Sequence, residues 1–396
     1  MLTHDTPTLW ETITNTAPGT GMATKHYGKD AAIYVFFVAL FVIIRQRIMY
    51  TDVPKLARYY GLSIQANAKV YSSFLEQVYL AIAHTIEFSV GAYLLWSAPY
   101  GGAFWARPTA MVKMWDTYPP QAYTTGLKVY YLGILAYWTH LALVMVVEDL
   151  QSARDRRQQA AVTTKQQQQV SAAAAAATAA TAPVPAQRYI PPRRNDYAEL
   201  CLHHVVTLSL IACSYVMNFL YVGHVIMALL DTADIVLAMA KTAKYVRKNK
   251  AADVLFGMFA VSWILTRHVF FGAIIWSVYN APSVIPLPHV WDTSVGRFYS
   301  WNVYYGFMGL LLTLQALLIF WLVLILRVVF RVLFVGEKAE DTRENFDEDE
   351  DEISEADTSA HADAKGRRDV RPVDVDTDAL LRRRLTRTDS GKDVKP

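Results

Sequence analysis

The sequence predicts an all-α polytopic membrane protein with about seven membrane-spanning helices, or eight if a weakly apolar segment also enters the bilayer. Hydrophobic residues make up 53% of the 396 residues. They gather into stretches long enough for a helix to cross about 30 Å of hydrocarbon, and the charged residues fall between these stretches or in the C-terminal tail. The expected spans are residues 31–48, 74–97, 128–147, 199–220, 224–239, 254–278 and 304–332.

Lysine and arginine residues predict how the spans are oriented. They are concentrated in the connections that follow the first, third, fifth and seventh spans, whereas the alternate connections contain few charges. Under the positive-inside rule, this asymmetry places the C-terminus in the cytosol and the N-terminus on the lumenal or external side. The polar lead before the first span lacks the n-region and cleavage site of a signal peptide, so we expect it to be retained.

Composition divides the chain into four segments. They are an N-terminal polar and amphipathic lead (1–30), the first span with its cytosolic connection (31–72), a membrane core (73–335) interrupted by a low-complexity cytosolic insertion (about 151–192), and a tail (336–396). The tail is acidic and then basic and has too little apolar content to build a core, so we expect disorder there. Within it, Ser354 is surrounded by acidic residues and is a candidate site for an acidophilic kinase, whose phosphate would add further negative charge.

Four ionisable side chains lie inside two of the expected spans. His203 and His204 lie in the fourth span, and Asp231 and Asp234 lie in the fifth. Insertion scales give a free-energy cost of roughly 2.5–3.5 kcal/mol for an aspartate at mid-bilayer, so such residues are expected to face a polar interior. The short uncharged connection 221–223 makes the two spans an antiparallel helical hairpin. The quartet therefore indicates a functional site between them.

Helical spacing adds further polar residues to the two faces that carry the quartet. They are Thr207, Ser214, Tyr215 and Asn218 on the fourth span and Lys241 on the fifth. His204 lies roughly 7–8 Å from the cytosolic end of its span, and Asp234 lies roughly 10 Å from the cytosolic end of its own. An imidazole and a carboxylate are therefore predicted to meet in a shared polar interior.

Residue chemistry alone leaves three kinds of function open. Histidine and aspartate together suit acid–base or nucleophilic catalysis. An aspartate pair at i, i+3 spacing suits cation binding or proton relay in a transporter, and imidazole with carboxylate also suits zinc or iron. A transporter is expected to spread its acidic residues over several spans, and Glu87 is the one other mid-membrane acid in the sequence.

The segment from His203 to Tyr245 resembles the signature of the ceramide synthases, which are members of the TLC-domain family. The matching residues are His203-His204-x-x-Thr207, Ser214-Tyr215, Gly223, Asp231-x-x-Asp234, Leu237, Ala240-Lys241 and Tyr245. The likeness extends over roughly residues 74–333 and leaves out the lead, the insertion and the tail. Leu230 and Ala238 stand where many animal members carry histidine and glutamate, which makes the pattern similar to that of fungal members.

The resemblance implies a TLC-type helical bundle that encloses a lipid cavity in the membrane of the endoplasmic reticulum. It also implies transfer of a fatty acyl chain from acyl-CoA to the amine of a sphingoid base, sphinganine or phytosphingosine, which gives ceramide or dihydroceramide. Acyl-CoA is then a co-substrate, and no cofactor, metal or nucleic acid is expected. The alternative within the family is a non-catalytic membrane protein that binds lipids or is associated with translocation.

The resemblance assigns expected roles to the polar residues. His203 is expected to act as general base or as acyl-accepting nucleophile, with His204 assisting and with Asp231 and Asp234 orienting the rings and balancing charge. Substrate contacts are expected from a wider set: Thr207, Ser214, Tyr215, Asn218, Lys241, Lys244, Arg247, Lys248, Arg267 and His268. Membrane lipids, a small single-span regulatory subunit and a homo- or heterodimer of catalytic chains are the implied partners.

Two basic groups have different expected positions. The cluster at 241–250, with Arg193 and Arg194, is expected at the cytosolic end of the hairpin, where it would attract the phosphates of CoA. Arg267 and His268 follow Lys250 by a length of helix of roughly 25 Å. We therefore expect them to be lumen-side structure or substrate contacts, and not partners of His203.

Overall fold

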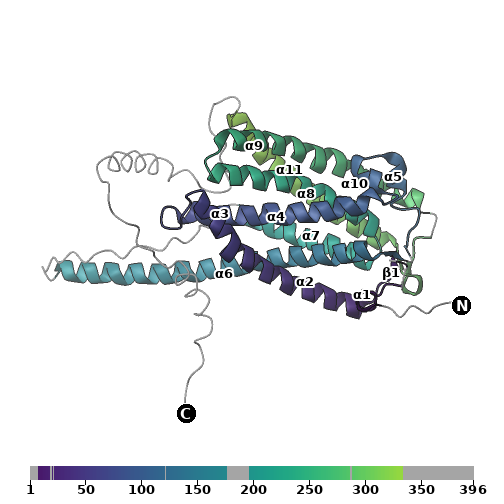
Figure 1. The fold of residues 1–396 in the computed structure, drawn as a ribbon, viewed down its shortest axis with the longest axis horizontal. Coiled ribbons are helices and arrows are strands. Elements are labelled where there is room, and N and C mark those ends of the chain that lie inside the picture. The colour runs from purple at the N-terminus through teal and green to yellow at the C-terminus, as the bar shows by residue number, and fades with distance from the viewer. Residues whose placement is uncertain are drawn as a thin grey trace, which may run out of the picture. The chain divides into compact units, whose positions relative to one another are not determined.

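The protein is a bundle of long helices with two short two-stranded sheets (Figure 1). The structure, a computed structural model, describes residues 8–332 apart from 18–19, 21, 121, 176–195 and 286–287. Within these residues, 7 helical segments are long and apolar enough to cross a membrane, and each expected span overlaps one of them, which confirms the predicted class. Ser354, the tail, Arg193, Arg194 and the part of the expected insertion from 176 onward lie outside the described residues.

The seven spans are built from one to three helical elements each. Two spans contain a π-helical segment, where one turn of the helix is wider than in an α-helix. The elements of the spans are α2 (Tyr27–Arg47) with η1 (Ile48–Asp52) and α3 (Val53–Tyr59), α4 (Ala68–Trp96), α6 (Thr125–Ala175), α7 (Tyr197–Val216), α8 (Leu220–Tyr245), α9 (Asn249–Ile264) with η3 (Leu265–Phe270) and α10 (Phe271–Val284), and α11 (Trp301–Phe330).

Local sequence explains where several of these helices begin and end. Asn67 and Ser300 precede α4 and α11, and their side chains accept hydrogen bonds from the backbone N–H groups of Val70 and Val303, which are otherwise unpaired at a helix start. α6 continues past the expected end of the third span to Ala175. The residues beyond that end are rich in alanine, glutamine and arginine, which are strong helix formers.

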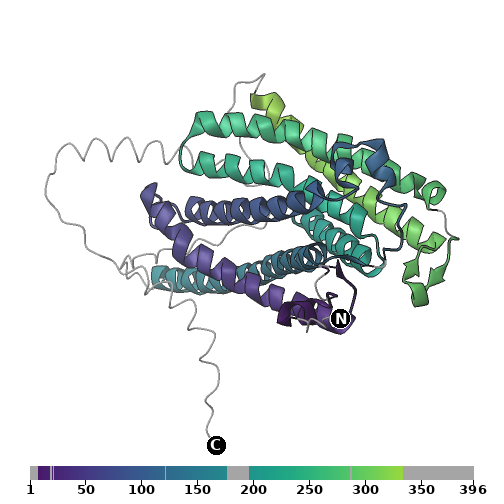
Figure 2. The same ribbon diagram turned by 45° about the vertical axis from the view of Figure 1, so that its right-hand side comes forward.

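The connections between spans gather at two ends of the bundle, because consecutive spans run in opposite directions (Figures 1 and 2). One end, called the strand end, carries two antiparallel strand pairs, β1 (Met22–Ala23) with β2 (Tyr123–Thr124) and β3 (Trp291–Asp292) with β4 (Arg297–Phe298). It also carries the short helices α1 (Leu9–Thr14) and α5 (Pro108–Val112) and the 3₁₀ turns η2 (Gly101–Trp105) and η4 (Thr293–Val295). The opposite end, called the basic end, carries Lys55, Arg58, Lys244, Lys248 and Arg327. The basic connections therefore share one end, as expected.

The turn between α7 and α8 differs from the prediction. It comprises Met217–Phe219, so the expected connection 221–223 is wrong and these residues form the first turn of α8. Asn218 makes this tight turn by adopting a positive φ of 66°, a conformation that asparagine tolerates better than most residues. Its side chain also donates to the Gly296 carbonyl at 2.8 Å. Gly223 is helical and packs against Tyr131, which leaves no room for a Cβ.

α8 is the central helix of the bundle. In the most apolar 18-residue stretch of α8, 50% is buried, whereas the corresponding share in the first span is 11%. α8 packs along α4 on one side and α9 on another. A Cβ at Gly91 of α4 would lie 3.2 Å from the Ala228 Cβ, so this glycine permits the close approach of the two helices. Side chains in the middle of α8 are consequently inside the protein and away from lipid.

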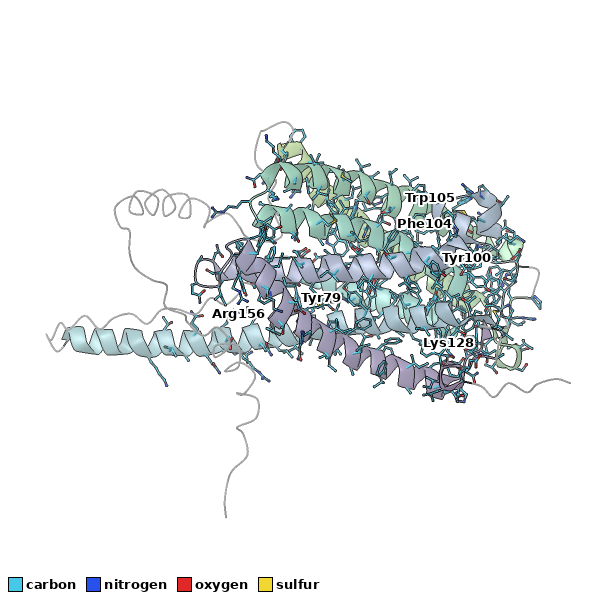
Figure 3. The ribbon with its side chains drawn as sticks, in the orientation of Figure 1. Tyr79, Tyr100, Phe104, Trp105, Lys128 and Arg156 are labelled. Atoms are coloured by element: carbon cyan, nitrogen blue, oxygen red, sulfur yellow. The ribbon has the colours of Figure 1, made fainter. Side chains whose placement is uncertain are left out.

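The N-terminal lead is fastened to the membrane core by a buried ion pair at the strand end. The Lys128 Nζ, at the start of α6, lies 2.6 Å from Asp30 Oδ1 of α2 and donates to the carbonyls of Thr14 and Thr24 (Figure 3). The Tyr215 hydroxyl of α7 donates to Asp30 Oδ2 at 2.8 Å. Because every hydrogen-bonding group in this cluster is shared between different segments, the cluster joins the lead, α2, α6 and α7.

Candidate active site

A cavity of about 110 Å³ lies inside the bundle and is bordered by α6, α7, α8, α9, η3 and α11. Its polar wall residues are His203, Thr207, Asp231, Asp234 and Arg267, and the rest of the wall is apolar or aromatic. Three of the four residues of the predicted quartet therefore face one enclosed space. The shared polar interior that the sequence predicts between the fourth and fifth spans is present.

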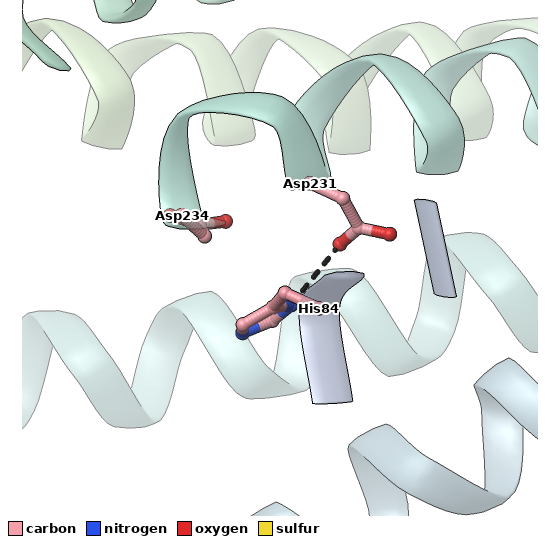
Figure 4. Close-up of side chains that lie close together, drawn as sticks. All are labelled: His84, Asp231 and Asp234. Carbon is pink, nitrogen blue, oxygen red and sulfur yellow. Dashed lines mark hydrogen bonds and ion pairs between the residues drawn. The ribbon is translucent and has the colours of Figure 1, made fainter. Parts of the chain in front are cut away.

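Asp231 is held by a histidine that the sequence interpretation missed. His84 of α4 places its Nδ1 3.3 Å from Asp231 Oδ1 and 3.6 Å from Glu87 Oε2 one turn along its own helix (Figure 4). All three side chains are buried. The signal available in the sequence was the pair His84-x-x-Glu87, which puts an imidazole and a carboxylate on one face of the second span.

Asp234 is held by Arg267 across the cavity. The guanidinium Nη2 lies 2.8 Å from Asp234 Oδ2, and the guanidinium also stacks over the Trp263 ring at 4.2 Å. The expected lumen-side position of Arg267 is therefore wrong. Side chains lean toward the N-terminus of their own helix, and α8 and η3 run in opposite directions, so these two long side chains lean toward one another.

The acids outnumber the bases in this buried group. Glu87, Asp231 and Asp234 face His84 and Arg267. Even when His84 is counted as an imidazolium, one carboxyl group has no basic partner of its own. Burial of an unpaired charge is unfavourable, so the group is suited to receiving a further cation or proton.

Three of these side chains also offer ligand atoms to a metal ion. One atom each from His84, Asp231 and Asp234 lies within 4.8 Å of the others. Arg267 places a fixed positive charge on Asp234, which opposes binding of a metal cation at the same carboxylate.

The two adjacent histidines differ in their surroundings. His203 lines the cavity between Trp138 and Trp321, with ring centroids at 5.5 and 5.3 Å. His204 is buried against Trp138 and lies outside the cavity wall. Among the described residues, neither ring is hydrogen-bonded to Asp231 or Asp234, because His84 and Arg267 occupy those carboxylates. The Nδ1 atoms of both histidines are buried and have no partner in the described part of the chain.

The other predicted substrate contacts are spread over the molecule. Tyr215 and Asn218 bind Asp30 and Gly296 at the strand end, and His268 accepts a hydrogen bond from Gln315 at 2.9 Å. Four basic residues lie at the basic end, in the last turns of α8 and the turn to α9, and none of them lines the cavity: Lys241, Lys244, Arg247 and Lys248.

A second cavity, of about 60 Å³, adjoins the first on the side of the strand end. The two share the wall residues Leu210, Ile211, Ile226 and Met227. The second cavity reaches Trp115, Phe219 and Tyr299 in the connections of the strand end, and Ser214 is the one polar aliphatic side chain in its wall. The polar site therefore adjoins an apolar cavity.

Comparison with known proteins identifies the bundle. Residues 73–327 match the family model described as the TLC domain, which is more than half of the chain. The chain belongs to the TLC-domain family. Its relatives include the sphingosine N-acyltransferase lag1 of Schizosaccharomyces pombe, which is 31% identical over 82% of this chain and 69% of the relative. They also include the ceramide synthase LAG1 of Saccharomyces cerevisiae, which is 26% identical over 84% of this chain and 67% of the relative.

The expected resemblance to the ceramide synthases of this family is thereby confirmed. The TLC domain includes all five polar residues of the cavity wall and the His84–Glu87 pair. The lead, which the family model does not match, contributes Lys25 and Asp30 to the strand end, where both side chains bind residues of α7 or the turn that follows it.

The dependence of Asp231 on His84 predicts a coupled effect on stability. His84→Leu leaves Asp231 and Glu87 as buried acids without a base, and we expect the free energy of unfolding to fall by about 3–5 kcal/mol. Adding Asp231→Leu removes the stranded charge, so the double variant should be more stable than the sum of the two single changes predicts. Thermal unfolding in detergent of the wild type, both single variants and the double variant measures the coupling. Strictly additive changes would contradict the pairing.

Proposed function

We propose that the protein is a sphingosine N-acyltransferase, a ceramide synthase, that transfers a fatty acyl chain from acyl-CoA to the amine of sphinganine or phytosphingosine. It is an acyltransferase enzyme, as its relatives are. One observation carries the proposal. His203 shares the wall of one cavity with the acidic residues Asp231 and Asp234, and an apolar cavity that could take part of a lipid tail adjoins it along α7 and α8.

His203 is placed to accept the acyl group. It is the one member of the histidine pair that lines the cavity, and its neighbours Trp138 and Trp321 exclude water from the ring. A neutral imidazole can attack a thioester carbon and release the thiolate, which divides one difficult acyl transfer into two easier steps. His204 lies behind Trp138 and supports the position of this wall.

The acidic wall is suited to the sphingoid base. The amine of such a base is an alkylammonium near neutral pH, because its pKa resembles that of lysine at about 10.4. The three carboxyl groups of Glu87, Asp231 and Asp234 outnumber the two bases His84 and Arg267, which favours entry of this cation. A carboxylate in the wall can then take one proton from the ammonium, leaving the neutral amine that attacks the acyl-histidine.

The second cavity is suited to the hydrocarbon tail of the acyl group. The walls of the two cavities together run along α8 from Val222, near the strand end, to Asp234, which at about 1.5 Å per residue is roughly 18 Å. A thioester carbon beside His203 can therefore have its chain directed toward Phe219 and Tyr299. The depth of this space would limit the chain length that fits.

The two ends of the bundle have different proposed surroundings. The basic end faces the cytosol in the membrane of the endoplasmic reticulum, in accordance with the positive-inside rule, and the C-terminus lies on the same side. Lys244, Arg247 and Lys248 at this end attract the phosphates of CoA. Acyl-CoA is a co-substrate and the reaction uses no cofactor. A single-span regulatory subunit and a second catalytic chain are proposed partners.

Product formation tests the proposed function. Purified protein with labelled acyl-CoA and sphinganine should form labelled dihydroceramide, and His203→Ala should lower the rate by on the order of 10³-fold, because a missing nucleophile or base removes most of the acceleration. His26→Asn is the matched control: His26 caps α2 at the strand end, and asparagine can keep that cap. A wild type without product, or His203→Ala at the control rate, would refute the proposal.

Acyl-chain selection tests the assignment of the second cavity. Ile226 lies where the two cavities meet, so Ile226→Trp should block the passage and lower the rate with long acyl-CoA by about 10-fold or more relative to short acyl-CoA. Phe307→Ala enlarges the same cavity near the strand end and should shift the preference toward longer chains. Rates with a series of acyl-CoA lengths measure both effects. Unchanged preference in both variants would show that the tail lies elsewhere.

A further inference from the structure

Two tryptophans in the cavity wall carry N–H groups without an acceptor. Trp321 of α11 and Trp263 of α9 are 6% and 5% exposed, and both line the polar cavity. The Nε1 atom of each is buried and has no hydrogen-bond partner in the part of the chain that the structure describes. An indole N–H can only donate, and buried donors normally find acceptors. An acceptor supplied by a ligand would satisfy them.

Trp321 is close to the histidine that faces the cavity. Its ring centroid lies 5.3 Å from that of His203, with the two ring planes inclined at 76°. Thr207 follows His203 by one helical turn, which places it on the same face of α7. The Thr207 hydroxyl lines the cavity, is buried and also lacks a partner among the described residues. Two neutral donors without an acceptor therefore lie in the same cavity wall as His203.

The other polar groups of the cavity wall near Trp321 already have partners or lie farther from His203. Asp231 and Asp234 contact His84 and Arg267, and among the described residues neither carboxylate accepts from Trp321. Trp263 lies 6.5 Å from Trp321, ring to ring, and Arg267 covers one face of its ring. Among the described residues, Trp321 and Thr207 are thus the donors that lack an acceptor and lie next to His203.

We propose that the Trp321 N–H and the Thr207 O–H bind the oxygen of the thioester carbonyl and stabilise the oxyanion that forms during acyl transfer. The proposal rests on the proposed function. When a His203 nitrogen forms its bond to the carbonyl carbon, the π pair of the carbonyl moves to oxygen. As that pair returns, the carbon–sulfur bond breaks and the thiolate leaves with the imidazole proton. Donors fixed at the oxygen lower the barrier of both events.

Release of CoA thiol in a single turnover without sphingoid base tests this assignment. Trp321→Phe keeps an aromatic ring and removes the N–H, and we expect the release rate to fall by on the order of 10²-fold while the acyl-CoA concentration for half-saturation changes less than about twofold. Thr207→Val removes the hydroxyl at similar volume and should also slow release, whereas Thr207→Ser should restore it. Trp263→Phe should have a smaller effect than Trp321→Phe.

The outcomes separate this inference from the proposed function. Trp321→Phe and Thr207→Val that release thiol as fast as the wild type would overturn the oxyanion assignment and leave the acyltransferase intact. Slower release caused only by weaker binding of acyl-CoA would overturn it as well, because an oxyanion donor acts in the transition state. A wild type that releases no thiol without sphingoid base but forms ceramide with it would overturn the oxyanion assignment and leave the acyltransferase intact, and a wild type that does neither would overturn both. If Trp321→Phe fails to fold, the Thr207 variants test the assignment. Slow thiol release by Thr207→Val and restored release by Thr207→Ser would support it, and equal release by the two would overturn it.

Discussion

Burial of Asp231 and Asp234 in the central helix is the constraint on which the rest of the structure depends. An aspartate inside a membrane bundle is stable only when a base or a proton accompanies it. α4 supplies His84 to one aspartate and η3 supplies Arg267 to the other, at 3.3 and 2.8 Å. These two ion pairs fix α8 between α4 and the sixth span, and they leave the carboxylates facing a cavity rather than lipid.

The same arrangement separates the functions that acyl transfer requires. One wall of the cavity is acidic and suits an ammonium, while the other carries His203 between tryptophans. The apolar continuation toward the strand end suits a hydrocarbon chain. Basic residues lie outside the cavity at the far end of the same helices, which is a suitable place for phosphates. The two substrates can therefore approach His203 with their polar groups on different walls.

The sequence predicted the helices and the existence of the site better than its contacts. Apolar length was sufficient for all seven spans, and helical spacing was sufficient to place His203 with Asp231 and Asp234. His84 was missed although its spacing from Glu87 puts both on one face of α4, because the helix that this face meets is decided by the close packing of Gly91 against Ala228. The depth of Arg267 was wrong because counting residues along the axis neglects the length and lean of an arginine side chain.

Trapping the acyl group on His203 tests the central claim most directly. Enzyme mixed with acyl-CoA in the absence of sphingoid base, quenched rapidly and mapped by peptide mass, should carry one acyl group on the peptide that contains His203. Fragmentation should place the group on His203 and not on His204, and sphinganine added before the quench should remove it as ceramide. An enzyme that makes ceramide but never carries an acyl group on His203 would contradict the account.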